Sequence, residues 1–242
     1  MILLGIESAT ELVGVAVADD DGPRAGVWAA GRRRHGESLA PAVAHALEQA
    51  QVGLDDVGAI AVDVGPGLFT GLRVGVATAK GLAQGLGVGV VALTSVEVLA
   101  RAAADAGWQG TVVAVIDARR GEVFAARYRS DARATGPLSE VSPPTRFQPE
   151  ELAKELAGVG EPLLAVGDGA RRYAADLEPV AGLVLAGPSL AWPPPATLVA
   201  LAGERLAGGA VPQPPSAVLP TYLREADARI NWSQRRSVPP GR

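Results

Sequence analysis

Residues 2–18 read ILLGIESATELVGVAVA, and a second stretch of the same shape, VVAVIDARRGEVFAARY, occupies residues 112–128. Each stretch consists of two short apolar runs rich in β-branched residues, separated by a polar turn, and this pattern predicts a β-hairpin. The two stretches align without a gap, so that Glu7 falls on Asp117. The chain therefore contains, once in each half, a hairpin whose first strand ends on a carboxylate.

A second, weaker repeat follows in the same order. IAVDVGPG from Ile60 and LAVGDGA from Leu164 are both apolar strands that run into glycines. Two repeated elements in the same order indicate a duplicated α/β domain, whereas the alternative is chance similarity between short apolar strands. We expect domains at residues 1–104 and 105–224, followed by a flexible tail at 225–242.

Composition excludes several classes of protein. The chain has 242 residues, of which 48% are hydrophobic and 20% charged, with a net charge of −4. No apolar run approaches the ~18 residues of a membrane span, and the N-terminus lacks a signal-peptide pattern, so we expect a soluble, cytoplasmic protein without membrane association. The net charge argues against one broad nucleic-acid-binding face. The absence of cysteine excludes disulfides, thiolate metal sites and cysteine nucleophiles.

Helices are predicted between and after the repeated elements. The segment ESLAPAVAHALEQAQ has apolar residues at helical spacing, with Ser38 as its N-cap. PEELAKELAG and PATLVALAGERLAGG indicate two further helices. Residues 129–149 are rich in proline, serine, arginine and glycine, so a loop is expected there. The basic run at 32–34 could contact a nucleic-acid backbone, as could the tail arginines at 229, 235 and 236, although such runs are usually solvated surface.

The segment GPGLFTGLRVGVATAKG at residues 65–81 resembles a phosphate-binding turn but completes neither phosphate fingerprint. Thr70 stands where a dinucleotide motif needs glycine, and no G-K-[ST] follows for a P-loop. Lys80 lies too far along the helix to reach a phosphate at its start. The helix instead has a ridge of very small residues, Gly71, Gly75, Ala79 and Ala83. Such a ridge allows a close approach either by another helix or by the protein's own sheet.

The carboxylates Glu7 and Asp117 could position a metal-bound water and phosphates across the two halves. However, Arg119 and Arg120 fill the second hairpin turn, where backbone amides would have to approach a phosphate. The alternative is that both carboxylates cap their turns. His45 has Gln49 one helical turn later rather than a second histidine, so the usual histidine pair of a metal hydrolase is not formed. We therefore predict neither catalytic nor metal-binding residues.

Taken together, the motifs ILLGIESAT, HGESLAPAV, GPGLFTGLRVGVATAKGLA, SVEVLA, DARRGEVFAARY and PTYLR resemble the TsaB (YeaZ) family. The resemblance covers residues 1–224. Members of this family are bacterial subunits of the machinery that makes threonylcarbamoyladenosine next to the anticodon of tRNAs that read codons beginning with A. The family belongs to the actin, Hsp70 and sugar-kinase superfamily. The resemblance thus implies two duplicated actin-like (ribonuclease H-like) domains, each a mixed sheet that opens with a β-hairpin and is flanked by helices.

The resemblance also implies a non-catalytic role without a cofactor. The chain would bind and support the threonylcarbamoyltransferase TsaD as a heterodimer, join a TsaE-like ATPase in a larger complex, reach tRNA indirectly, and form a homodimer when alone. In the family the partner face is built from two helices that here match Ser38–Gln51 and Gly71–Leu86. The residues expected at or near the contact are Leu39, Val43, Leu72, Gly75, Val76, Ala79 and Ala83.

Two departures from the family pattern weaken any nucleotide interpretation. Glu7 replaces the usual aspartate and Leu68 the usual serine, so Glu7, Gly65, Gly67 and Asp117 are interpreted as degenerate nucleotide positions. One alternative is an active ATP-binding enzyme of the superfamily. The other is a metallopeptidase of the glycoprotease type, which the residues support less because no metal cluster and no nucleophile–base pair can be identified.

Overall fold

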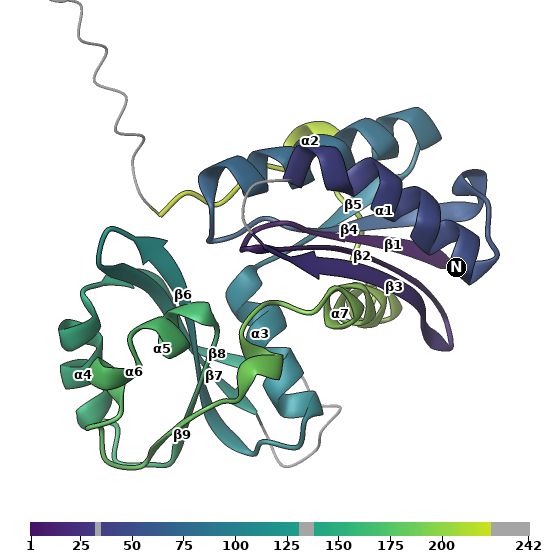
Figure 1. The fold of residues 1–242 in the computed structure, drawn as a ribbon. Coiled ribbons are helices and arrows are strands. Elements are labelled where there is room, and N and C mark those ends of the chain that lie inside the picture. Colours follow the sequence, from purple (N-terminus) through teal and green to yellow (C-terminus); the bar gives the residue numbers. More distant parts are fainter. Residues whose placement is uncertain (32–34, 131–137, 224–242) are drawn as a thin grey trace, which may run out of the picture.

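The computed structural model describes residues 1–31, 35–130 and 138–223, which form two α/β halves (Figure 1). The first half contains a five-stranded sheet in the order β3-β2-β1-β4-β5, and the second a five-stranded sheet in the order β10-β9-β6-β7-β8. The strands are β1 (Ile2–Glu7), β2 (Leu12–Asp19), β3 (Gly22–Ala30), β4 (Val57–Asp63), β5 (Gly89–Leu93), β6 (Gly110–Arg119), β7 (Glu122–Ser130), β8 (Ser139–Phe147), β9 (Leu163–Val166) and β10 (Leu183–Leu185). The α-helices are α1 (His35–Ala50), α2 (Phe69–Leu86), α3 (Ser95–Asp105), α4 (Pro149–Ala157), α5 (Asp168–Arg172), α6 (Ala174–Leu177) and α7 (Pro195–Ala207). Short 3₁₀ turns are η1 (Leu54–Asp56), η2 (Pro188–Leu190) and η3 (Pro215–Ala217).

The duplication predicted from the sequence is confirmed by the topology. In the first sheet β1 pairs antiparallel with β2 and parallel with β4, and in the second sheet β6 pairs antiparallel with β7 and parallel with β9. The two repeated hairpins and the two repeated strands therefore occupy equivalent positions in the two sheets. This duplicated arrangement is the actin-like fold expected from the sequence.

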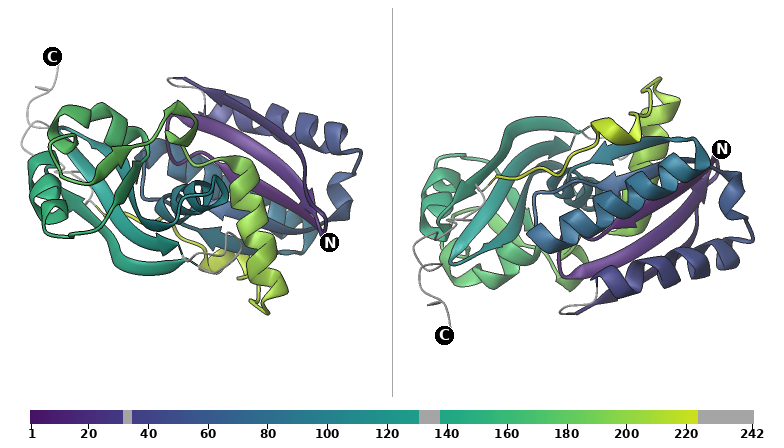
Figure 2. Two further views of the ribbon diagram at one scale, coloured as in Figure 1. Left: turned by 90° about the horizontal axis from the view of Figure 1, so that it is seen from below. Right: turned by 90° about the horizontal axis from the view of Figure 1, so that it is seen from above.

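Each sheet is covered on both faces. Helices α1 and α2 lie side by side on one face of the first sheet, and α7 lies on the other (Figures 1 and 2). The strands are accordingly apolar on both sides. Along β2, Val13, Val15 and Val17 pack beneath α1, whereas Ala16 and Ala18 pack with Val199 of α7.

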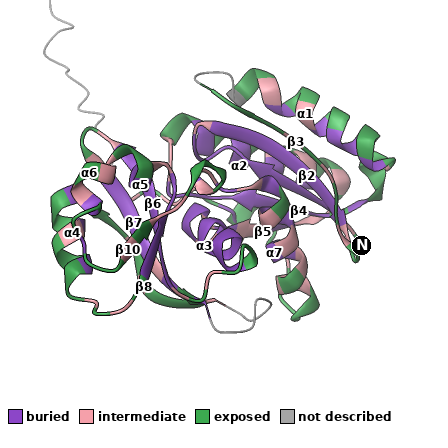
Figure 3. Cartoon of the chain, turned by 60° about the horizontal axis from the view of Figure 1, so that its bottom comes forward, coloured by how far each residue is buried: buried purple, intermediate pink, exposed green. Residues whose placement is uncertain are grey.

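Helix α3 packs on one face of the second sheet, and helices α4, α5 and α6 cover the other. Nearly every residue of α3 is buried, and the helix lies between the two sheets (Figure 3). Its Thr94 N-cap accepts a hydrogen bond from the backbone N–H of Glu97. Because α3 also contacts α7, it links the two halves of the molecule.

The chain crosses between the halves more than once. Helix α7 follows the second sheet in sequence but packs on the first. The segment after it stays with the first half, where Gln213 forms a bridge with Val90 and the Thr221 N–H donates to the Val64 carbonyl. The boundary expected between residues 104 and 105 remains a prediction, and the packing of the two halves does not follow chain order.

The loop predicted at residues 129–149 is wrong in part, because β7 extends to Ser130 and β8 occupies Ser139–Phe147. Strand β8 is mostly exposed and contains Pro143 and Pro144, so its sequence resembles a loop. The helices expected at 38–51 and 71–86 are confirmed as α1 and α2. The N-cap predicted at Ser38 is wrong, because α1 begins at His35 and Ser38 lies within its first turn. Predictions for the basic run at 32–34 and the tail at 225–242 lie outside the described residues.

Candidate functional site

The glycine turn between β4 and α2 is closed by the protein's own backbone. The Leu68 N–H donates to the Ala9 carbonyl over 2.6 Å. A Cβ added at Gly67 would lie far inside van der Waals contact with that same carbonyl oxygen. Gly65 has a φ of +102°, a conformation that favours glycine. These glycines are therefore explained by a turn packed against the β1–β2 connection.

The small-residue ridge of α2 packs on the sheet of its own chain, which decides between the two interpretations left open by the sequence. The Ser8 hydroxyl donates to the Gly71 carbonyl over 2.9 Å, and a Cβ at Gly75 would collide with that hydroxyl. Ala79 and Ala83 belong to the core beneath α1 and α2. The ridge lets α2 approach β1 closely.

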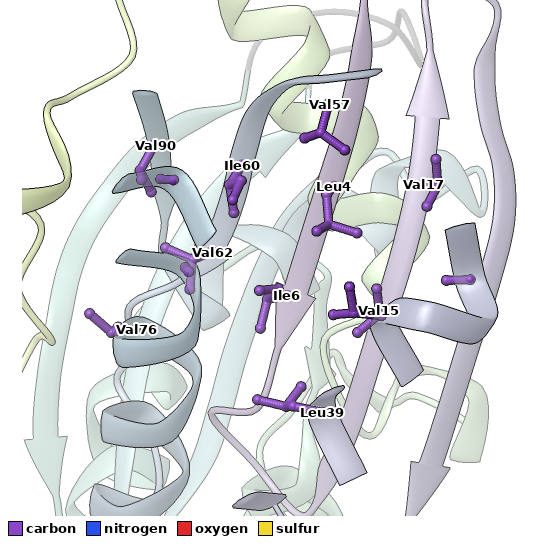
Figure 4. Packing of buried hydrophobic residues seen from close by; sticks show 14 of the residues in the cluster. Leu4, Ile6, Val15, Val17, Leu39, Val57, Ile60, Val62, Val76 and Val90 are labelled. Atoms are coloured by element: carbon purple, nitrogen blue, oxygen red, sulfur yellow. The ribbon is translucent and has the colours of Figure 1, made fainter. Parts of the chain in front are cut away.

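The residues expected at or near the partner contact are all buried within this chain. They are Leu39, Val43, Leu72, Gly75, Val76, Ala79 and Ala83. Figure 4 shows Leu39 and Val76 pointing into the core between the helices and the first sheet. Contact with a partner through these two helices stays a prediction. In this conformation these seven residues would support such a surface from below rather than form it.

The outer face of α2 has its own set of small residues. Ala77, Gly81 and Gly85 are exposed, and a Cβ added at either glycine would meet nothing within 4 Å. On the neighbouring helix, Ala40, Pro41 and Ala44 are exposed as well. We call these residues of α1 and α2 the small-residue face. The sequence signal for it was the continuation of glycines beyond the buried ridge.

Glu7 and Asp63 form a fully buried carboxyl pair at the ends of the neighbouring parallel strands β1 and β4. Glu7 Oε1 accepts from the Ala9 N–H, and Asp63 Oδ1 accepts from the Gly65 N–H and the Ser95 hydroxyl, all within 2.8 Å. Burial and the neighbouring Asp63 hold the pKa of Glu7 well above its usual range. Burial also raises the pKa of Asp63. A proton on Glu7 would let one carboxyl donate a hydrogen bond to the other. Such a bond would offset part of the free-energy cost of burying both groups.

The equivalent turn of the second half is filled by arginine. Arg119 and Arg120 have φ values of +64° and +59°, and the Arg119 guanidinium donates to Asp117 over 2.9 Å and to Glu11 over 2.7 Å. The Asp117 N–H donates to Asp168, and burial raises the pKa of Asp168 to about 6. Asp117 is thus the acceptor of an ion pair rather than an open phosphate or metal position.

Asp63, Asp168 and Glu11 were not singled out from the sequence. Asp63 follows an apolar strand as Glu7 does, and this repeated strand-end carboxylate was the available signal. Glu11 could not be connected to Arg119 from the sequence because the contact joins different halves. Lys80 Nζ donates to the Val218 carbonyl over 3.0 Å.

Metal ligands do not cluster in the part of the chain that the structure describes. Among residues 1–31, 35–130 and 138–223, no group of three or more histidine, aspartate or glutamate side chains could hold a metal ion. His45 is exposed on α1, with Nδ1 3.4 Å from Glu48 Oε2. Within the same described ranges, no helix combines the length and hydropathy needed to cross a bilayer.

Comparison with known proteins adds family membership to this geometry. The family model TsaD, described as tRNA N6-adenosine threonylcarbamoyltransferase, matches residues 29–232. The tRNA threonylcarbamoyladenosine biosynthesis protein TsaB of Escherichia coli is 31% identical over 185 residues, which is 76% of this chain and 78% of that protein. The chain belongs to the TsaB family. The family resemblance inferred from the sequence motifs is therefore confirmed.

Solved structures agree with this assignment. YeaZ from Pseudomonas aeruginosa superimposes with a TM-score of 0.78 at 28% sequence identity, covering 92% of this chain and 99% of that one. Component A of (R)-2-hydroxyglutaryl-CoA dehydratase from Acidaminococcus fermentans has a TM-score of 0.50 at 11% identity, covering 86% and 99%. The second likeness is one of fold alone.

Proposed function

We propose that this TsaB-family chain is a non-catalytic subunit in the formation of threonylcarbamoyladenosine in tRNA, and that it binds and supports a TsaD-like threonylcarbamoyltransferase. A TsaE-like ATPase would join the larger complex, and tRNA would be reached through the complex. The E. coli relative is named for this biosynthesis, which supports the assignment of the pathway. The family model that matches most of the chain supports a link to the transferase.

The observation that carries the partner role is the pair of exposed glycines on α2. Glycine within a helix destabilises it by roughly 1 kcal/mol relative to alanine, because of its backbone freedom. Gly71 and Gly75 are explained by the sheet beneath them, but nothing in the described chain lies above Gly81 and Gly85. A second helix that approaches α2 closely would explain both, because the distance between helix axes depends on the side chains at the contact.

The closed glycine turn and the arginine-filled second turn support the non-catalytic part of the proposal. A phosphate site needs backbone N–H groups that are free to approach the anion. Here the Leu68 N–H is bonded to Ala9, and Arg119 occupies the space beside Asp117. A nucleotide would have to displace both arrangements.

Co-purification with TsaD from the same genome tests the partner surface. Substitutions at Gly75 or Ala79 would not test it, because an arginine there would disrupt the core. Ala77→Arg and Gly81→Arg instead place a long charged side chain on the small-residue face. We expect each to weaken binding at least about tenfold, a typical loss when a well-packed contact is disrupted.

Ala196→Arg is the matched control, since Ala196 is exposed on α7, on the opposite face of the first sheet. Circular dichroism would show that all three variants are folded. If Ala77→Arg and Gly81→Arg bind TsaD as tightly as the Ala196→Arg control, the small-residue face is not the partner surface.

A further inference from the structure

Among the described residues, the last part of strand β3, beyond Pro23 and Arg24, is an open sheet edge. Open edges expose unpaired N–H and C=O groups and are usually blunted by charge, proline, short length or a covering segment. Of the four edges formed by the described strands, β5 is bridged by Gln213, β10 has only three residues, and β8 contains Pro143, Pro144 and charged residues. The last part of β3, residues 26–30, reads GVWAA and contains neither a charged residue nor a proline.

The register of β3 determines which of its backbone groups face outward. The Gly31 N–H donates to the Glu11 carbonyl over 3.1 Å, so residues 11 and 31 form a hydrogen-bonded antiparallel pair. Such pairs alternate along the ladder, and the next ones join Val13 to Ala29 and Val15 to Val27. Gly26, Trp28 and Ala30 therefore direct their N–H and C=O groups to the open side.

These outward residues form a small–large–small pattern that is complementary to itself. Trp28 is 63% exposed and lies over Gly14, on the side of the sheet covered by α7. If two β3 strands pair antiparallel about Trp28, each Gly26 stands opposite an Ala30 of the other copy. The two indole rings then meet as a cross-strand aromatic pair, with no bulky side chain beside them.

The opposite side of β3 also has room for an added strand. A groove of about 430 Å³ runs between β3 and α1, lined by Val27, Ala29, Pro41, Ala42 and His45 among others. An added β3 would direct its own Val27 and Ala29 towards this groove, because side chains alternate between the faces of a sheet. Both side chains are small, and the groove beside them lies open between β3 and α1.

We propose that β3 binds β3 of a second copy of this chain, antiparallel and centred on Trp28, so that the first sheets of both copies become continuous. This contact uses the edge of the sheet rather than the small-residue face. The homodimer expected from the family resemblance uses α1 and α2, so the two proposals stand or fall separately. With β3 paired, the small-residue face of each copy remains open to another partner.

Sedimentation equilibrium of the purified full-length chain tests the pairing. The measurement is made in a Gly81→Arg background, so that self-association through the helices does not contribute. We expect a concentration-dependent dimer there, and for Trp28→Lys in the same background a dimer dissociation constant raised at least about tenfold, because two lysines would oppose each other at the centre. Val184→Lys is the matched control, since Val184 is 51% exposed on the edge strand of the other sheet. The control should dimerise like the wild type.

A cross-link gives a second readout that does not depend on loss of binding. The chain has no cysteine, so Trp28→Cys introduces a single thiol that meets its copy only at the proposed centre. Mild oxidation should yield a covalent dimer with Trp28→Cys and none with Val184→Cys. A monomeric wild type at all concentrations would overturn the proposal. So would a dimer that Trp28→Lys leaves intact and Gly81→Arg dissociates, which would assign self-association to the helices.

Discussion

At the residue scale, substitutions of glycines that look alike in the sequence should change the stability of the protein in opposite directions. Gly67→Ala should lower the stability of the protein by about 1–3 kcal/mol, because the new Cβ collides with the Ala9 carbonyl and the backbone must shift. Gly81→Ala should raise stability by roughly 1 kcal/mol, because nothing lies near its Cβ and alanine favours the helix. Denaturant unfolding measures both changes. Equal signs for the two variants would contradict this division of the glycines.

The buried pair of Glu7 and Asp63 predicts a pH-dependent stability. The pKa of Glu7 is raised on folding, so the folded state holds its proton more tightly than the unfolded state. Stability from this group is therefore fully present below the unfolded pKa, near 4.3, and is lost as the pH rises through the folded pKa.

Glu7→Gln should remove this loss of stability at high pH. Its amide can still accept from the Ala9 N–H and donate to Asp63, and it does not titrate. At pH 8 the variant should melt a few degrees above the wild type, and at pH 4.5 the difference should shrink. Thermal melts at a series of pH values measure the difference between the two proteins, which cancels the other titrating groups. A difference that does not change with pH would show that Glu7 is not the group that holds the proton.

At the residue scale, the sequence identifies the strand-end carboxylates but not the side chains that lie next to them in the fold. Glu7 and Asp117 were recognised because each ends the first strand of a repeated hairpin. Their partners depend on contacts between distant segments. Asp63 is brought to Glu7 by the parallel pairing of β1 with β4, and Arg119 reaches Glu11 across the two halves. The sequence could thus predict strand-end carboxylates, but not that Glu7 is buried beside a second carboxyl while Asp117 accepts from arginine.

At the scale of elements, predictability follows apolar periodicity on one face. The hairpin strands and α1, α2, α4 and α7 have clear apolar periodicity because they pack against a core, and all were predicted. Helices α3, α5 and α6 and strands β5 and β10 were not predicted, although α3 is almost wholly buried. The outer strands β3 and β8 were missed as well. Each has polar or proline residues where an edge strand faces solvent, so the alternation that identifies a strand is weak.

The position of α7 predicts that the first half cannot fold without it. A fragment of residues 1–104 retains the first sheet but exposes the face that contains Leu3, Ala16 and Ala59, which α7 covers through Val199. We expect this fragment to unfold without a cooperative transition and to aggregate, because an uncovered apolar sheet face is not stable in water. A fragment of residues 1–223 is the control and should melt cooperatively. A cooperative transition for 1–104 would show that this half folds independently.

At the scale of the whole molecule, the duplication was visible in the sequence, whereas the packing between the copies was not. The apolar periodicity of a segment indicates which of its faces is buried. It does not indicate which sheet that face packs on, so the packing of α7 on the first sheet could not be predicted from its sequence. Helix α3 illustrates this: it is buried on nearly all sides because it touches both the second sheet and α7. The relative placement of the halves depends on such contacts.

The ion pair between Arg119 and Glu11 predicts how firmly the halves are held together. Arg119 joins Glu11 of the first half to Asp117 of the second, and Asp117 is also 3.4 Å from Arg172. Arg119→Ala therefore removes a link between the halves and leaves Asp117 with a more distant cation. Because the pair is partly exposed, the loss of stability should be modest, about 1 kcal/mol. The local effect should be larger, since the two hairpin turns would open more often without global unfolding.

Hydrogen exchange measures that opening. Amides of the β1–β2 and β6–β7 turns should exchange faster in Arg119→Ala than in the wild type, while those of α4 should be unchanged. Arg146→Ala is the control, because Arg146 pairs with Glu122 within the second half. If both variants accelerate exchange only in the second half, Glu11 is not held by Arg119 in solution. The halves would then be joined by α3, α7 and the returning C-terminal segment, whose contacts are mainly apolar and buried.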